Sequence, residues 1–174
     1  NAERYDITYV DANSKKHNPL ILHCSPTGAI ERIIYALLEK AAIKEREGKT
    51  PTLPLWLSPT QIRLIPVSWD KHGKRCLELT EIIKKNGIRV DIDDRVESVG
   101  KRIRDSEVEW VPFMLVVGNK EAKGVSFIVR DRENDKEEKM RLDELISFIN
   151  SKTKNMPFDT LPLPVKISER ISFT

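Results

Sequence analysis

An unbroken apolar run at residues 112–117 constrains the fold more than any other stretch of this chain. A strand with one face in water alternates apolar and polar side chains, whereas a strand covered on both faces is apolar throughout. Residues 112–117 are therefore predicted to form a central strand, in a sheet that has other elements packed on both faces.

The stretches around this run supply the other elements of such a sheet. We predict further strands at residues 62–67, 88–92 and 125–130, and helices at residues 70–86, 97–109 and 142–149. Asn86 and Gly87 form a suitable end for the first of these helices. The order strand, helix, strand, helix, strand, strand, helix predicts the α/β class, with a small mixed β-sheet flanked by helices.

The apolar period also predicts which side chains of the first two helices point inward. We expect these to be Cys76, Leu79, Ile82 and Ile83 in the first helix, and Val99 and Ile103 in the second, with Lys101, Arg102 and Arg104 outward. Residues 118–124 are predicted to be a polar connection. The dense charge run at residues 132–139 is most simply a solvated turn between strands.

The amino-terminal part has a different pattern. Residues 5–10 and 18–24 are predicted to form a hairpin of two strands, of which residues 19–23 are buried. A helix should follow, with Ser25 as its cap, Pro26 at its first position and Gly28 allowing close approach of another group. Its apolar face, which includes Ile30, Ile33, Ile34, Leu37, Leu38 and Ala41, predicts an amphipathic helix docked on another element.

A charged helix end followed by Gly48 and Pro51 marks an exposed linker. We therefore divide the chain into a first domain at residues 1–48, a linker at 49–57, a second domain at 58–154 and an extended tail at 155–174. The chain starts at Asn1 without a methionine, and we expect it to be a fragment of a longer protein.

Charge and cysteine content exclude several classes of function. The formal net charge is +3, too small for a broad cationic surface that binds duplex nucleic acid through many phosphates, so any RNA contact should be local. Cys24 and Cys76 lack paired spacing, which favours reduced thiols and a cytoplasmic location. No apolar run approaches the length of a membrane span, and we expect no membrane partner.

A strand that ends in His23, followed by a helix with Arg32 in its first turns, resembles the third signature motif of class II aminoacyl-tRNA synthetases. In detail the chain resembles the threonyl-tRNA synthetase family, in its archaeal form. The resemblance extends through residues 54–61, 87–95, 103–121 and 126–132. It implies that residues 1–48 are the end of a class II catalytic domain and that residues 58–154 are an anticodon-binding domain.

The family resemblance assigns roles to two residues of the first domain. His23 matches a zinc ligand whose partner ligands would lie outside this chain, and Arg32 matches the arginine that contacts the ATP phosphates. Imidazole is a common zinc ligand, and guanidinium binds phosphate oxygens in a fork. The implied cofactors are zinc, ATP and its Mg²⁺ in the complete enzyme. The implied partners are tRNA(Thr), threonine and a second copy in a homodimer formed through the missing catalytic domain.

The resemblance also places anticodon contacts at Glu121 and Arg130. A carboxylate can accept from the donors of guanine, and arginine can donate to base carbonyls and stack on a flipped-out base. Without the family resemblance, an equally good interpretation is that Glu121 is a turn residue and that Arg130 forms a cross-strand ion pair. Bacterial members have a base-contacting asparagine where this chain has Val96, so either Arg95 and Glu97 make that contact here or the loop recognises shape.

Two functional hypotheses follow. The first is the C-terminal part of a threonyl-tRNA synthetase, which recognises the tRNA(Thr) anticodon, supports ATP-dependent attachment of threonine and is inactive as an isolated fragment. The second is a non-enzymatic RNA-binding or accessory protein built on the same domain. The presence of both His23 and Arg32 favours the first. A relative specific for proline or histidine and a flavodoxin-like signalling domain are weaker alternatives.

Overall fold

The computed structural model describes residues 1–26 and 28–171. Thr27 of the predicted helix entry and residues 172–174 of the predicted tail lie outside the described residues. The chain divides into two compact units, residues 1–36 and residues 37–174. This division falls inside α1 (Ile30–Arg46), upstream of the predicted boundary at residue 48, and the domain limits given above stay predictions.

The second unit contains a five-stranded mixed sheet with the strand order β4-β3-β5-β6-β7. Its strands are β3 (Ile62–Pro66), β4 (Val90–Ile92), β5 (Phe113–Val117), β6 (Ser126–Asp131) and β7 (Lys136–Arg141). β3 pairs in parallel with β4 and β5, whereas β6 pairs antiparallel with β5 and β7. The predicted fold class, a small mixed sheet flanked by helices, is confirmed.

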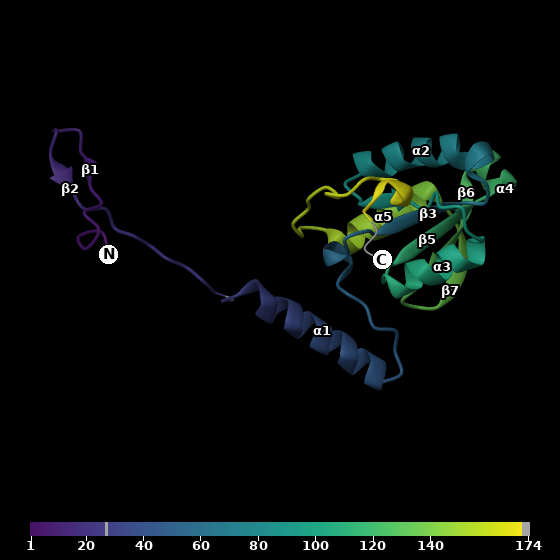
Figure 1. Ribbon diagram of the computed structural model, residues 1–174, viewed down its shortest axis with the longest axis horizontal. Helices are drawn as coiled ribbons and strands as arrows, with labels where there is room; N and C mark the ends of the chain where they lie inside the picture. Colours follow the sequence, from purple (N-terminus) through teal and green to yellow (C-terminus); the bar gives the residue numbers. More distant parts are fainter. Residues whose placement is uncertain (27, 172–174) are drawn as a thin grey trace. The chain divides into compact units, whose positions relative to one another are not determined.

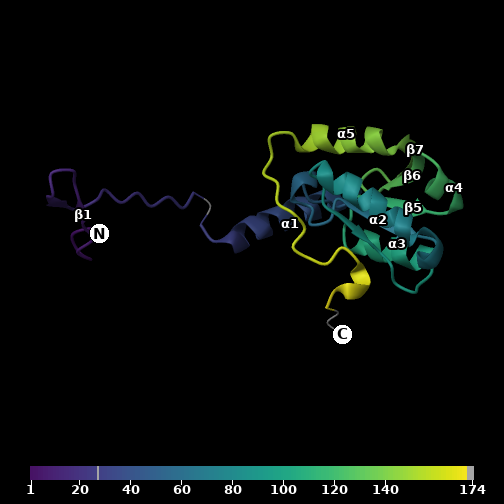
Figure 2. The ribbon, with the colours of Figure 1, turned by 90° about the horizontal axis from the view of Figure 1, so that it is seen from above.

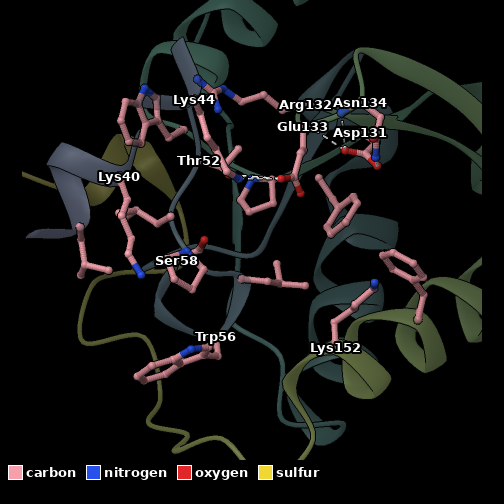
Figure 3. Close-up of a pocket in the computed structure, with 18 residues that line it drawn as sticks. Lys40, Lys44, Thr52, Trp56, Ser58, Asp131, Arg132, Glu133, Asn134 and Lys152 are labelled. Carbon is pink, nitrogen blue, oxygen red and sulfur yellow. Dashed lines mark hydrogen bonds and ion pairs between the residues drawn. The ribbon is translucent and has the colours of Figure 1, made fainter. Parts of the chain in front are cut away.

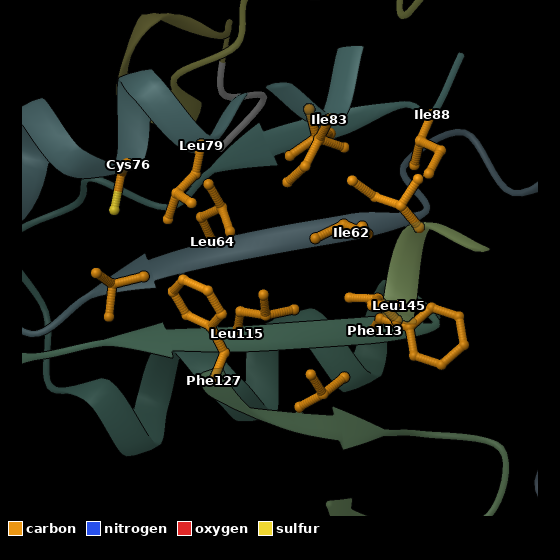
Figure 4. Packing of buried hydrophobic residues seen from close by; sticks show 14 of the residues in the cluster. Ile62, Leu64, Cys76, Leu79, Ile83, Ile88, Phe113, Leu115, Phe127 and Leu145 are labelled. Carbon is orange, nitrogen blue, oxygen red and sulfur yellow. The ribbon is translucent and has the colours of Figure 1, made fainter. Parts of the chain in front are cut away.

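Helices cover both faces of this sheet, as the apolar run in β5 predicts (Figure 1). They are α2 (Trp69–Lys85), α3 (Val99–Val108), α4 (Asn119–Lys123) and α5 (Leu142–Thr153), with 3-10 turns η1 (Leu55–Leu57) and η2 (Ile167–Glu169). The main core lies between the sheet and α2 and α5, and it includes Leu64, Leu115 and Phe127 (Figure 4). A smaller core around Met114 packs against α3 on the opposite face.

The structure corrects four details of the second unit. The predicted solvated turn contains a strand, β7, whose charged side chains suit an exposed sheet edge. The predicted connection at 118–124 contains the short helix α4. Ile82 is 43% exposed although we expected it inside, because the neighbouring Ile83 occupies the inward position. Arg102 is buried although we expected it outside, and its guanidinium donates to the carbonyl of Asp93.

The first unit forms much less secondary structure than its pattern predicts. Its hairpin consists of β1 (Tyr9–Val10) and β2 (Lys16–His17), which pair over two residues each. No strand forms at 19–23, where Leu20 and Leu22 are each 87% exposed, because no described segment pairs with this stretch. α1 begins at Ile30, so neither the cap at Ser25 nor the first helical position at Pro26 is observed.

The carboxyl-terminal tail does more than extend from α5. Residues 155–163 contain no helix or strand, but Lys166 forms a parallel β-bridge with Ile92 of β4. Val165 packs against the main core. Figure 2 shows the tail returning from the end of α5 toward the α2 side of the domain. In the described part of the chain, no helix is both long enough and apolar enough to cross a bilayer.

Candidate nucleic-acid interface

A cross-strand row of side chains lies on the sheet face that α3 covers. Strand register places Asp91, Arg63, Met114, Arg130 and Glu137 side by side on five neighbouring strands. Residues directly opposite each other on paired strands share a face of the sheet, so an arginine lies on each side of the central methionine and an acid lies beyond each arginine. The predicted recognition residue Arg130 is part of this row.

The inner half of the row is a buried ion pair. Nε and Nη2 of Arg63 donate to the two carboxylate oxygens of Asp91, each at 2.9 Å, and the two side chains are 1% and 0% exposed. Burial lowers the pKa of Arg63, but hydrogen bonds and the charges of Asp91 and Glu109 outweigh it and raise that pKa overall. Arg63 therefore stays charged and binds α3, through Ser106 and Glu109, to the sheet.

Arg130 occupies the more exposed half of the row. Its Nε donates to Glu107 of α3 at 2.8 Å and its Nη1 donates to Glu137 of β7 at 2.9 Å, while its side chain is 30% exposed. Burial lowers the pKa of Arg130, and hydrogen bonds to Glu137 and Glu107 raise it by more. Its Nη2 also donates to Asp135 at 3.4 Å, and since a guanidinium has five N–H donors, these three acidic partners fix its plane and leave donors for a base.

The loop between β4 and α3 contains Arg95, Val96 and Glu97. Arg95 donates from Nε and Nη2 to the buried Asp93, at 2.9 and 2.7 Å, and its Nη2 also lies 3.0 Å from Asp105 of α3. Among the described residues, Nη1 of Arg95 has no hydrogen-bond partner. Val96 is fully exposed beside it, so the loop presents donors next to a bare apolar side chain.

Glu97 and Glu121 have local partners of their own. Glu97 forms an ion pair with Lys101 one helical turn later in the chain. Glu121 lies in the first turn of α4, where its Oε2 accepts from the backbone N–H of Gly118 at 3.1 Å. The start of α4 is itself held by His72 of α2, whose Nε2 lies 2.9 Å from Oδ1 of Asn119. Glu121 therefore has a fixed backbone and one carboxylate oxygen outside this cap.

The structure brings three of the four predicted recognition residues to the end of the sheet where the parallel strands finish. β3, β4 and β5 are parallel. The loop with Arg95 and Glu97 follows the carboxyl end of β4, and the turn before Glu121 follows the carboxyl end of β5, so both lie at this end of the sheet. Arg130 instead pairs with Met114, near the start of β5. The five residues of β5 span about 13 Å at 3.3 Å per residue, so Glu121 and Arg130 lie near opposite ends of this strand.

The two residues predicted to act in catalysis, His23 and Arg32, lie in the first unit and both are exposed. The described residues contain no group of three or more histidine, cysteine or acidic side chains that could hold a metal ion. A structural or catalytic zinc site has three or four protein ligands. The described residues of this chain therefore do not form a zinc site by themselves.

A cavity of about 570 Å³ lies elsewhere in the second unit, between the end of α1, the segment before β3 and the turn between β6 and β7 (Figure 3). Lys44 lines this cavity, and its Nζ donates to Thr52 at 2.7 Å and to Glu133 at 2.9 Å. Aromatic side chains line its wall, namely Trp56, Trp110, Phe113 and Phe148. None of the six predicted site residues lines this cavity.

Comparison with known families agrees with this geometry. A family model described as "Anticodon binding domain" matches residues 61–152, which contain the whole five-stranded sheet and all four predicted recognition residues. The chain belongs to the anticodon-binding domain family. The anticodon-binding domain thus comprises the sheet, α2 to α4 and nearly all of α5, with the tail outside the match.

The chain is similar over nearly its whole length to curated proteins named threonine–tRNA ligase. It is 49% identical to the one from Methanothrix thermoacetophila over 99% of this chain, and 52% identical to the one from Methanobrevibacter smithii over 98%. The protein from Pyrococcus furiosus is 49% identical over 99% of this chain. The chain spans 28% of the length of each of these relatives, so the resemblance to the threonyl-tRNA synthetase family is confirmed for a part of such proteins.

Solved structures share the fold. The RNA-binding domain of threonyl-tRNA synthetase from Cryptosporidium parvum matches with a TM-score of 0.57 and 27% identity, covering 91% of this chain and 37% of that one. A prolyl-tRNA synthetase from the same organism matches with a TM-score of 0.59 and 23% identity, covering 86% and 30%. The second likeness concerns the fold alone.

Sequence reasoning missed the charged residues that hold α3 against the sheet and orient the predicted recognition residue Arg130. Arg63 and Asp91 each stand between apolar residues of a strand, and we did not predict that they pair. One charged residue of opposite sign in each of two buried strands is a usable signal of a buried ion pair. Glu107, the α3 partner of Arg130, gave no such signal, because exposed helix acids are common and its contact is 23 residues distant in sequence.

Proposed function

We propose that this chain is the anticodon-binding, C-terminal part of a threonine–tRNA ligase and that it binds tRNA(Thr) through the anticodon bases. The observation that carries this proposal is identity of about one half, over 98–99% of the chain, to proteins with that name. The family match over the sheet and its helices supports the RNA-binding part of the proposal.

The geometry of the arginines supports base recognition rather than backbone binding. Arg95 and Arg130 are each oriented by acidic partners, which neutralise much of their charge but leave N–H groups directed away from those partners. Phosphate binding depends mainly on net positive charge, whereas bases are recognised by donors and acceptors in fixed positions. We therefore assign Arg95, Arg130 and Glu121 to base contacts and Glu97 to positioning of the loop through Lys101.

Binding to two matched RNAs tests this function. The 174-residue chain would be titrated with tRNA(Thr) and with the same tRNA carrying substitutions at the second and third anticodon bases. We expect the substituted tRNA to bind at least tenfold more weakly, since each of the two lost base contacts is worth about 1 to 3 kcal/mol. Equal binding of both RNAs would contradict the proposal and would favour an accessory RNA-binding role.

The proposal extends to the first unit through the longer protein. There, Arg32 would contact the ATP phosphates, with Mg²⁺ as the ion of ATP, and His23 would be one zinc ligand among others supplied outside this chain. A bound zinc would bind the substrate amino acid as a Lewis acid. We also propose threonine as substrate, a homodimer formed by the remainder of the protein, and a cytoplasmic location.

Metal content gives the test for His23. In the complete protein, His23→Ala should lower the bound zinc measured by atomic absorption, while Arg32→Ala, as the matched control, should leave zinc unchanged and slow ATP–pyrophosphate exchange. Unchanged zinc in His23→Ala would contradict the ligand role. The isolated chain should show no pyrophosphate exchange, because it spans only 28% of the length of the ligases it matches and most of the proposed ATP site lies outside it.

A further inference from the structure

The tail after α5 closes onto the outer edge of β4. The backbone N–H of Ile92 donates to the carbonyl of Val165 at 2.8 Å, and Lys166 forms a parallel bridge with Ile92. β4 is the last strand on its side of the sheet, so its outer edge would otherwise present unpaired backbone groups. We call residues 164–170 the tail latch.

Two side chains of the tail latch hold acids that flank Ile92. Ser168 donates to Asp94 twice, from its backbone N–H at 3.0 Å and from its hydroxyl at 2.6 Å. Nη2 of Arg170 donates to Oδ2 of Asp91 at 2.9 Å. Arg170 is also anchored within the tail latch, since its Nε donates to the carbonyl of Pro164 at 3.0 Å.

These contacts reach the loop between β4 and α3, which contains Arg95. Asp94 is the residue immediately before Arg95, and it follows Asp93, whose carboxylate holds the Arg95 guanidinium. The loop is therefore fixed from two sides, by Asp93 from the interior and by Ser168 through Asp94 from the tail latch.

We propose that the tail latch is a positioning element for anticodon recognition, which orders the loop between β4 and α3 so that Arg95 is held ready for a base. The inference rests on the proposed function for its RNA-binding half. Its structural half, the ordering of the loop by the tail latch, does not depend on that function. A loop that is already ordered loses less conformational entropy when RNA binds, so an intact tail latch should raise affinity without touching RNA. Ser168, Arg170 and Asp94 are positioning residues, because they act through Arg95.

The structural half is tested without RNA, by hydrogen exchange on the complete chain. The double variant Ser168→Ala/Arg170→Ala removes the side-chain contacts to Asp94 and Asp91, and Asp91 keeps Arg63 and Thr60 as partners. We expect faster exchange at the Ile92 amide, which donates to Val165, and at the Glu97 amide, which donates to the Arg95 carbonyl inside the loop. Unchanged exchange at Glu97 would overturn the proposal, whatever the RNA results.

The functional half uses RNA binding with a matched control. The double variant should bind tRNA(Thr) about three- to tenfold more weakly, and it should cause no further loss when Arg95→Ala is already present. Glu169→Ala is the control, since its side chain contacts only Lys166 within the tail latch, and it should change neither exchange nor affinity. Ser168→Ala alone serves as the milder variant if the double variant unfolds.

The outcomes separate this inference from the proposed function. Faster exchange with unchanged affinity, or an equal loss in the Arg95→Ala background, would overturn the positioning role while leaving anticodon binding intact. Failure of the unmodified chain to distinguish tRNA(Thr) from its anticodon-substituted form would instead overturn the proposed function.

Discussion

Residues 1–36 expose apolar side chains, whereas residues 37–174 bury charged ones. Leu20 and Leu22 in the first unit are each 87% exposed, while Arg63 and Asp91 in the second are 1% and 0% exposed. Hydropathy alone would predict the reverse. The difference shows that burial depends on partners: the second unit pairs its strands and pairs Arg63 with Asp91, whereas the described part of the first unit contains no partner for its apolar stretch.

The largest expected effect comes from the buried charges. Asp91→Ala should lower the free energy of unfolding by about 3 to 5 kcal/mol, because it leaves the Arg63 guanidinium buried without its main counter-charge. Urea denaturation followed by circular dichroism measures this. Asp11→Ala is the matched control in the first unit, where the partner His17 is exposed, and it should have little effect. Similar urea midpoints for Asp91→Ala and Asp11→Ala would contradict the difference in charge burial between the two units.

Apolar truncation should show the same contrast at a slightly smaller size. Leu115→Ala removes a fully buried side chain of the central strand and should cost about 2 to 5 kcal/mol of unfolding free energy. Leu22→Ala removes the same atoms from an exposed position and should change it by less than about 0.5 kcal/mol. If Leu22→Ala were as destabilising in the same chain, the first unit would have a buried core that the structure does not show.

The two cysteines give the smallest effect near neutral pH, and this effect depends on pH. Burial raises the pKa of the Cys76 thiol to about 12, whereas Cys24 is exposed. Because the folded-state pKa lies above the unfolded value of 9.0, this stabilising contribution is complete below pH 9 and is lost as pH rises toward 12. At pH 8 a thiol reagent should modify Cys24 within minutes and Cys76 only on unfolding. Equal modification of both would contradict the burial of Cys76.

Most of the fold could be predicted from local pattern and from one long-range constraint. The apolar run at 112–117 required cover on both faces, and the structure places α2 and α5 on one face and α3 on the other. β7 could not be predicted in the same way, because a charged edge strand has no apolar alternation to reveal it. Residues 19–23 have the pattern of a buried strand, but a strand forms only where its backbone groups find a partner.

Family resemblance predicted the residues of the candidate site, but it did not predict the residues that hold their side chains in place. Resemblance supplied Arg130, Glu121 and the loop at Arg95, but Glu107, which orients Arg130 from α3, lies 23 residues away in sequence. Ion pairs of that kind depend on strand register, which is settled only when the sheet is assembled. The tail latch is hidden for the same reason: Ser168 and Asp94 are 74 residues apart.

A double-mutant cycle on RNA binding tests the central claim, that the second unit recognises anticodon bases through oriented side chains. Arg130→Ala and Glu121→Ala should each weaken binding of tRNA(Thr) by about 1 to 3 kcal/mol and should cost much less against a tRNA in which the contacted base is already changed. Arg141→Ala, an exposed arginine of β7 paired with Asp143, is the matched control and should act equally on both RNAs. Equal losses on both RNAs for Arg130→Ala and Glu121→Ala would contradict the account, because the two residues would then support the RNA backbone or the fold.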